Sequence, residues 1–144
     1  MSFLLDTNIV SETVRRRPEP RVLSWLGAQL ASDLFLASVT IGELVRGARR
    51  VSDPARQRLY QRWIEDDLVR QFEGRVLPFD LGAARLWGEM MGDGDRIDQP
   101  RSAADTQIAA IARLHDLTLV TRNVSDFRAF EVRLLNPWAS LPQE

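Results

Sequence analysis

The chain has 144 residues, a formal net charge of −1, and 44% hydrophobic and 27% charged residues, which is typical of one globular domain. It has no cysteine, so thiolate nucleophiles, zinc–thiolate sites and disulfides are excluded, and its single histidine, His115, excludes a multi-histidine zinc site. All 19 basic residues are arginine, and the lack of lysine excludes a Walker-A P-loop and Schiff-base catalysis.

Two strand–turn–helix units are expected in the first third of the chain. The apolar run 3–5 predicts a strand that stops at Asp6, and the run 34–37 predicts a strand that ends in the segment 38–40. Apolar side chains at helical spacing predict a short helix after the first strand, a helix before the second strand and a helix after it. Their stripes are Ile9, Val10 and Val14, then Val22, Leu23, Trp25, Leu26 and Leu30, then Ile41, Leu44, Val45 and Ala48.

The same alternation continues to the end of the chain. A helix is predicted over 54–72 with Gly74 as its stop, followed by a strand over 75–79 whose Pro78 favours a sheet edge or an early end. The later elements are a helix over 81–91, a flexible loop that begins at Asp93 and runs to Arg101, a helix over 102–115, and strands over 117–121 and 132–135.

The predicted strands are continuous apolar runs rather than alternating patterns, which indicates a sheet covered on both faces. Strands that alternate with helices indicate parallel pairing. We therefore predict an α/β fold with three layers, α/β/α, and a central, mostly parallel sheet of about five strands. Because the chain has no repeat, linker or low-complexity tract, we expect residues 1–144 to be a single domain.

Four acidic residues fall at the carboxyl ends of the strands, where such a sheet opens its functional crevice. Asp6 directly follows the first strand, and Glu43 is expected in the first turn of the helix after the second. Asp105 is expected in the first turn of the last long helix, and Asp126 in the loop after the next strand. Gathered in one dry crevice, these carboxylates would repel one another unless a divalent cation neutralised them. Oxygen ligands favour Mg²⁺ or Mn²⁺.

Each of these carboxylates also has a purely structural interpretation. The segments 40–43 and 102–105 both match a capping box, in which the acid satisfies free N–H groups at a helix start. Asp6 is placed to form a turn with Asn8, and Asp126 to cap the short turn that follows it. Capping accounts for each position separately, but it does not explain why all of them lie at one edge of the sheet.

Four short motifs occur in order along the chain. They are Leu4-Leu5-Asp6-Thr7-Asn8, Ser38-Val39-Thr40-Ile41-Gly42-Glu43-Leu44, Ala103-Ala104-Asp105-Thr106-Gln107-Ile108-Ala109-Ala110 and Leu119-Val120-Thr121-Arg122-Asn123-Val124-Ser125-Asp126-Phe127. Together they resemble a PIN domain, and more narrowly a VapC toxin, over nearly the whole chain. The segments 74–80 and 136–138 are similar to the FitB-like branch of that family.

The resemblance implies a metal-dependent endoribonuclease that uses Mg²⁺, with Mn²⁺ able to substitute. It also implies the toxin of a type II toxin–antitoxin pair, which cleaves cellular RNA, with structured RNA such as tRNA the expected target. Asp6, Glu43 and Asp105 match the acidic positions of the family. The fourth position is open between Asn123 and Asp126, and we prefer Asp126 for its charge.

On this interpretation Asp6 and Asp105 are the main metal ligands, and Glu43 acts through a water molecule or as a general base. Asp126 completes the acidic set. The metal would stabilise the charge that develops on the scissile phosphate, so no protein nucleophile is needed. The residues expected to support the site as hydrogen-bond donors are Thr7, Asn8, Thr121 at the rim, and Asn123.

RNA binding must rely on local arginine clusters, because a pI of about 5.9 gives no overall basic surface. Arg46 and Arg50 lie four residues apart on the predicted helix that carries Glu43, and Arg122 lies beside the fourth motif. The segment 15–17 is a further cluster. The alternative interpretation of each cluster is an ordinary solvated surface.

The partners follow from the resemblance in outline. We expect a VapB-type antitoxin, a homodimer, and a higher-order complex that binds operator DNA through the antitoxin. Apolar residues of the segment 54–72 could serve either a homodimer or an antitoxin helix, and an antitoxin arginine could pair with the acidic crevice. No apolar run reaches the roughly 18 residues needed to cross a bilayer, and the start is typical of a strand rather than a signal peptide, so we expect a cytoplasmic protein without membrane contact.

Two other functions remain open from the sequence. One is a catalytically silent PIN-like binding or regulatory module whose carboxylates serve mainly as caps. The other is a metal-dependent nuclease that acts on DNA. A phosphatase is disfavoured because Asp6-Thr7-Asn8 stands where an Asp-x-Asp nucleophile motif would follow the strand.

Overall fold

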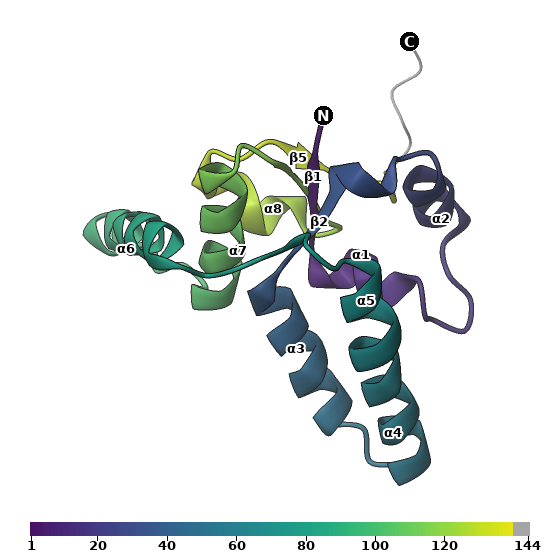
Figure 1. Ribbon diagram of the computed structural model, residues 1–144. Helices are drawn as coiled ribbons and strands as arrows, with labels where there is room; N and C mark the ends of the chain where they lie inside the picture. The colour runs from purple at the N-terminus through teal and green to yellow at the C-terminus, as the bar shows by residue number, and fades with distance from the viewer. Residues whose placement is uncertain (140–144) are drawn as a thin grey trace.

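The computed structural model describes residues 1–139 and has a five-stranded sheet in the order β3-β2-β1-β4-β5 (Figure 1). All of the strand pairings are parallel and helices flank the sheet, which confirms the expected α/β fold. The strands are β1 (Phe3–Leu5), β2 (Leu34–Ala37), β3 (Val76–Leu77), β4 (Thr118–Val120) and β5 (Leu134–Leu135).

The helices fill the connections between these strands. The α-helices are α1 (Thr7–Glu12), α2 (Pro20–Gly27), α3 (Ser38–Arg49), α4 (Pro54–Arg62), α5 (Val69–Gln71), α6 (Leu81–Arg96), α7 (Ala103–Leu114) and α8 (Val124–Phe127). Two short 3₁₀ turns, η1 (Ala31–Asp33) and η3 (Arg128–Phe130), and a π-helical segment, η2 (Trp63–Leu68), complete the set. Within residues 1–139, no helix is long and apolar enough to cross a bilayer.

Strand β1 lies at the centre of the sheet and separates two hydrophobic cores. Leu4 belongs to the core formed with α7 and α8, whereas Phe3 and Leu5 belong to the core formed with α1, α2 and α3. All three side chains of β1 are buried. A strand buried on both faces must be apolar throughout, which explains why its sequence shows no polar alternation.

The edge strands are shorter than the sequence predicts. β3 has two residues instead of the expected 75–79, and it lies at the sheet edge and ends directly before Pro78. β5 occupies the opposite edge and is also limited to two residues, within the expected 132–135. Proline at the end of β3 removes the N–H that would continue the ladder, so both expectations about Pro78 are confirmed.

The predicted helix over 54–72 is helical almost throughout, but its middle is the π-helical segment η2. Together with α3 it forms an arm that projects from the sheet (Figure 1). Ile64 and Leu68 are buried in the core, and Gly74, at φ +78°, ends the segment in a backbone conformation that favours glycine. A single wide turn leaves the apolar spacing almost unchanged, so the sequence pattern does not reveal it.

The flexible loop expected over 93–101 is wrong in its first half, because α6 continues to Arg96. Gly94 is buried in this last part of the helix. A Cβ atom at Gly94 would lie 2.8 Å from the main-chain oxygen of Gln99 and 3.0 Å from the side chain of Arg101. The glycine that suggested a loop therefore allows the returning chain to pack directly on the helix.

We predict that Gly94→Ala lowers the free energy of unfolding by about 1–3 kcal/mol, because the added methyl group must displace main-chain atoms. The matched control is Gly92→Ala on the same helix, where a Cβ would meet no atom within 4 Å. That variant should be neutral or more stable by up to about 1 kcal/mol. Urea unfolding of both variants is the measurement, and equal stability would show that the close approach at Gly94 has no energetic cost.

Candidate active site

Asp6 is the first residue after the central strand, and its carboxylate is 6% exposed. Its main-chain N–H still donates to the Val120 carbonyl of β4 at 2.9 Å, so the sheet fixes its position. Asp6 Oδ1 accepts the N–H of Thr7 at 2.8 Å and caps α1, and Oδ2 accepts the hydroxyl of Thr121 at 2.8 Å. Asp6 therefore acts as a cap, as the structural interpretation predicts, but it is also bonded across the sheet.

Asn8 and Thr121 join the ends of β1 and β4 around this carboxylate. The Asn8 amide donates to Asp6 Oδ2 and to the Thr121 hydroxyl oxygen, both at 3.4 Å, and its oxygen accepts the Arg122 N–H at 3.3 Å. Thr121 also accepts the N–H of Asn123 at 3.0 Å. The expected donor roles of Asn8 and Thr121 agree with these bonds, but Thr121 is fully buried rather than at the rim.

Glu43 contacts the same group of residues from α3. Its Oε1 accepts the hydroxyl of Thr7 at 2.9 Å, a bond between residues 36 positions apart. The capping box expected over 40–43 is wrong, because α3 begins at Ser38 and Glu43 lies in its second turn rather than its first. The Thr40 hydroxyl is buried with no partner among the described residues. Glu43 is therefore free of any role at the helix start.

Asp105 and Asp126 approach from the other side of the sheet. Asp105 lies in the first turn of α7, and its N–H donates to Ser102 Oγ at 3.3 Å, so Ser102 caps the helix as the expected capping box requires of the serine. Asp126 lies in the short helix α8 rather than in a loop, and among the described residues its side chain caps no helix. Asn123 contributes its main-chain N–H to the site through Thr121.

The acidic side chains influence one another's charge. Burial raises the pKa of Asp6, hydrogen bonds from Thr121 and Thr7 partly offset this, and the charges of Glu43 and Asp126 raise the pKa further. Burial is also the largest cause that raises the pKa of Asp105, and the charges of Asp6 and Asp126 raise it further. A hydrogen bond with Ser102 lowers it. All four predicted acids thus belong to one electrostatic cluster, and no arginine of residues 1–139 forms an ion pair with any of them.

The cluster fits a divalent cation by the chemistry of its donors, which are all carboxylate oxygens. Among residues 1–139, however, no three acidic or histidine side chains are close enough together to form a ready coordination shell. Like charges hold carboxylates apart, and a bound cation would favour their approach. The arrangement in the described residues is therefore an acidic cluster that is not closed into a coordination shell.

The three arginines expected to contact RNA have different surroundings. Arg46 and Arg50 are exposed at the end of α3 and form no ion pair within the described residues. The guanidinium of Arg122 lies 5.3 Å from the centre of the Trp138 ring, and the Arg122 carbonyl accepts the amide of Asn136 at 3.4 Å. Arg122 is therefore partly fixed next to Asn8, whereas Arg46 and Arg50 are free to move.

Glu12 is a charged residue to which the sequence analysis gave no role. It is 2% exposed on α1, and both of its oxygens accept from Arg15 Nη1 at 3.1 Å. The only available signal was the spacing of three residues in the sequence, and Arg15 lies just beyond the end of α1. This pair lies at the end of α1 opposite Asp6.

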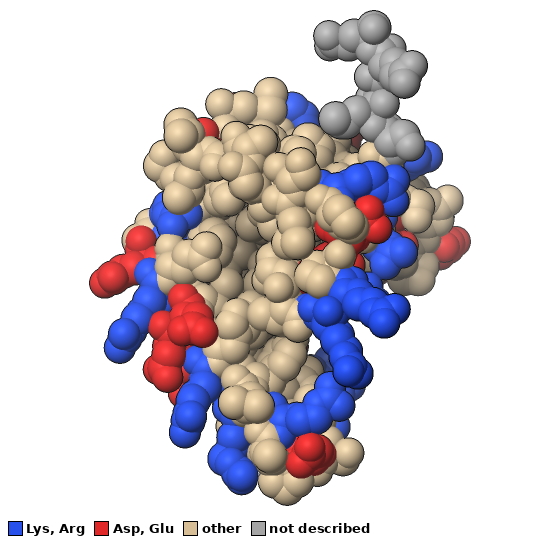
Figure 2. Space-filling model, turned by 90° about the vertical axis from the view of Figure 1, so that its right-hand side faces the viewer, with Lys and Arg blue, Asp and Glu red and all other residues tan. Residues whose placement is uncertain are grey.

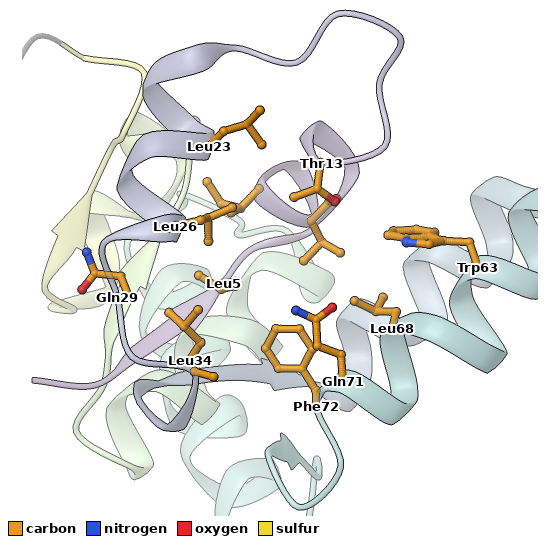
Figure 3. Close-up of a pocket in the computed structure, with 14 residues that line it drawn as sticks. Leu5, Thr13, Leu23, Leu26, Gln29, Leu34, Trp63, Leu68, Gln71 and Phe72 are labelled. Carbon is orange, nitrogen blue, oxygen red and sulfur yellow. The ribbon is translucent and has the colours of Figure 1, made fainter.

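A separate apolar groove of about 390 Å³ lies between α2 and the arm, and we call it the α2 groove (Figure 3). Leu23 and Leu26 of α2 face Trp63, Leu68 and Phe72 across it. The rest of its lining comes from β1, α1, the start of β2 and the segment between α2 and β2. Leu23 is 42% exposed, so apolar surface remains open to solvent in the described residues.

The PIN-domain profile matches residues 3–131. The chain belongs to the PIN-domain family. Toxin FitB of Neisseria gonorrhoeae is 34% identical over 136 residues, which cover 94% of this chain and 98% of FitB. VapC ribonuclease Y4jK of Sinorhizobium fredii is 35% identical over 136 residues, which cover 94% of this chain and 97% of Y4jK. The resemblance inferred from the sequence motifs is thereby confirmed.

Solved structures share the fold over the whole chain. The crystal structure of FitAcB from Neisseria gonorrhoeae matches with a TM-score of 0.89 and 33% identity, and covers 96% of this chain and 99% of that one. The structure of FitAB bound to the IR36 DNA fragment matches with a TM-score of 0.89 and 31% identity, and covers 99% of both chains. Ribonucleases with a PIN domain generally depend on a divalent metal ion.

We predict that Asp105→Asn makes the metal-free protein more stable at neutral pH. Folding raises the pKa of Asp105 above its ordinary value of 3.8. At pH values above 3.8 the ionised carboxylate therefore destabilises the folded state. The neutral amide of asparagine removes this effect. The melting temperature of the variant should exceed that of the wild type by a few degrees at pH 7. The difference should shrink as the pH falls through the raised pKa of Asp105 toward 3.8, where the wild-type carboxyl is also neutral.

The matched control is Asp93→Asn, which removes an exposed charge on α6 outside the cluster. Its melting temperature should stay close to that of the wild type at every pH. A melting temperature for Asp105→Asn below that of the wild type at pH 7 would contradict the unfavourable charge assigned to this site.

Proposed function

We propose that the chain is a metal-dependent endoribonuclease and acts, as one PIN domain over 1–144, as the toxin of a type II toxin–antitoxin pair. The observation that carries this proposal is the cluster of Asp6, Glu43, Asp105 and Asp126 around the carboxyl end of the central strand. The names of its relatives, toxin FitB and VapC ribonuclease Y4jK, support RNA cleavage as the activity. The expected target is structured cellular RNA such as tRNA, whose cleavage would inhibit translation and growth.

Mg²⁺, with Mn²⁺ able to substitute, would be held by Asp6 and Asp105, with Glu43 and Asp126 completing the set. When bound, the ion would polarise the scissile phosphate and lower the pKa of a bound water molecule. Hydrogen bonds from Thr7 and Thr121 orient the Asp6 carboxylate and keep it in place.

Glu43 is suited to accept a proton from water. One of its oxygens is fixed by the Thr7 hydroxyl, and no partner within the described residues occupies the other. The general base of a hydrolysis reaction must present a free oxygen in a fixed orientation. Asn8 and Asn123 keep the end of β4 against this group of residues through their bonds with Thr121.

Arg46, Arg50 and Arg122 are the residues that we propose contact the RNA backbone. Arg46 and Arg50 extend from the helix that carries Glu43, and Arg122 follows Thr121 at the end of β4. Each of them is close in sequence to a member of the acidic cluster, Glu43 or Asp126, and a guanidinium can bind an RNA phosphate there. Such an enzyme would meet its substrate in the cytoplasm.

A VapB-type antitoxin is the proposed protein partner, and the α2 groove is its proposed site. An amphipathic helix can place its apolar face against Leu23, Leu26 and Trp63, and an antitoxin arginine can pair with the acidic cluster. We also propose that the toxin is a homodimer and that the complex binds operator DNA through the antitoxin. The structure of FitAB bound to a DNA fragment supports the last step.

The decisive test is RNA cleavage by the antitoxin-free protein with Mg²⁺ or Mn²⁺, using total RNA and a DNA of matched length. Cleavage of RNA that stops with EDTA is expected. Asp105→Asn should lower the rate at least about 100-fold, because it removes a charge that the ion requires. Cleavage of the DNA alone would instead establish a DNA nuclease. Absence of cleavage and of any metal-induced rise in melting temperature would establish a non-catalytic module.

Light scattering during gel filtration tests the proposed partners. The chain alone should have a measured mass of twice that of the monomer. Addition of the antitoxin encoded by the neighbouring gene should give a complex of larger mass. Leu23→Asp should abolish that complex without changing the dimer, because a charge in the α2 groove cannot be solvated under a bound helix. Leu30→Asp is the matched control, since Leu30 is 70% exposed and does not line the groove. Equal binding by both variants would contradict the proposed site.

A further inference from the structure

A second hollow lies at the far end of α1, away from the acidic cluster. It has a volume of about 490 Å³ and is lined by Ser11, Val14, Arg15, Arg16, Arg17, Arg56 and Tyr60, and we call it the arginine pocket. Its volume falls in the range of about 300–1,000 Å³ that small-molecule sites occupy. Four of its lining residues carry a full positive charge.

Three of these charges have no acidic partner within residues 1–139. Arg16, Arg17 and Arg56 are exposed and form no ion pair with any described residue. Arg15 is different, because the buried Glu12 holds its guanidinium through both carboxylate oxygens at 3.1 Å. The pocket thus combines one fixed guanidinium with three free ones, which is an arrangement that suits an anion with several oxygens.

The floor of the pocket continues into an apolar hollow of about 280 Å³. Val14, Arg56 and Tyr60 line both hollows, and Leu59 and Trp63 complete the apolar one. The rings of Tyr60 and Trp63 meet edge to face, with 5.4 Å between their centres. A site that is cationic on one side and aromatic on the other matches a nucleotide, which has a charged phosphate and a flat base.

The surroundings of the pocket are basic as well. The segment 44–62, which includes the end of α3 and all of α4, has six arginines and one acidic residue, Asp53. Figure 2 shows blue side chains around the lower end of the molecule, with one red group beside them at the left and a smaller one at the bottom. A polyanion is therefore favoured along this surface beyond the pocket itself.

The pocket is also at a useful distance from the acidic cluster. Asp6 caps the start of α1, the pocket begins at Ser11, and a helix of six residues is about 9 Å long. At about 3.4 Å per stacked nucleotide, this distance corresponds to about three nucleotides. One RNA strand can therefore occupy both places.

We propose that the arginine pocket binds an unpaired nucleotide of the RNA substrate, a few nucleotides from the scissile bond. This inference rests on the proposed function and adds a substrate-binding site that is separate from the acidic cluster. Arg15, held by Glu12, and the free Arg16, Arg17 and Arg56 bind the phosphates. Tyr60 and Trp63 provide the surface for the base. An acidic protein segment would satisfy the arginines but would leave the aromatic hollow without a flat group to contact.

Binding is measured apart from cleavage, with fluorescein-labelled unfractionated tRNA, EDTA and the Asp105→Asn variant, by fluorescence anisotropy. Adding Arg16→Ala and Arg17→Ala should weaken binding roughly tenfold or more and reduce the slope of log affinity against log salt by about 2. The matched control adds Arg85→Ala and Arg96→Ala, two exposed arginines on α6. It removes the same charge and should change the affinity by less than about threefold, because distant charges are screened.

Two results would overturn the proposal. One is equal weakening by the two pairs of substitutions, which would mean that only the net charge matters. The other is displacement of the tRNA by poly-L-glutamate as effectively as by poly(U) at equal charge concentration, which would indicate a protein partner. Unchanged melting temperatures of the variants show that folding is intact. Failure of the proposed function would appear separately, as tRNA binding by a wild-type protein that cleaves no RNA.

Discussion

The buried carboxylate of Asp6 is the constraint on which the rest of the site depends. β1 is paired on both sides, so the residue that follows it cannot move without disturbing the sheet. Its charge is kept away from water, which would be unfavourable without the N–H of Thr7 and the hydroxyl of Thr121. Thr7 in turn holds Glu43 through its hydroxyl. The bonds that stabilise one buried charge thus also fix the direction of α1, the end of β4 and the position of α3.

The α/β class of the fold could be predicted from the sequence, because the apolar runs of strands and the apolar stripes of helices depend only on neighbouring residues. The sequence was also sufficient to place Asp6 after the first strand and Asp105 in the first turn of a helix, since the limits of both elements are well marked. It placed Glu43 in the first turn of its helix instead of the second, and it could not reveal the bond to Thr7, because that residue is 36 positions away. The same limit explains the error at Gly94, where glycine in a helix permits contact with a later segment. Local patterns cannot distinguish such contacts from turns.

Net charge is a poor guide to the partners of this protein. The total of −1 combines a cluster of acids and a surface of arginines that form no ion pairs with each other within residues 1–139. Charges of opposite sign cancel in the sum, but a ligand responds to the field near its own binding site, within about 10 Å at ordinary ionic strength. A phosphate chain can therefore be held by the arginines while an ion sits among the carboxylates beside it. The near-neutral pI and an RNA substrate are compatible for this reason.

The deficit of positive charge in the acidic cluster also connects catalysis with inhibition. Burial and repulsion from the neighbouring carboxylates raise the pKa of Asp6 and of Asp105. A cation that binds among these carboxylates relieves the repulsion, and its binding is therefore favoured. On the proposed function, a divalent ion supplies the missing positive charge in the active enzyme. An antitoxin arginine supplies it in the inhibited complex. The divalent ion and the antitoxin arginine then compete for the same carboxylate oxygens. The antitoxin therefore needs no separate means of excluding the metal. On the proposed function, the affinity of the antitoxin would come largely from the α2 groove, and its arginine would block the reaction by neutralising the carboxylates that the metal ion needs.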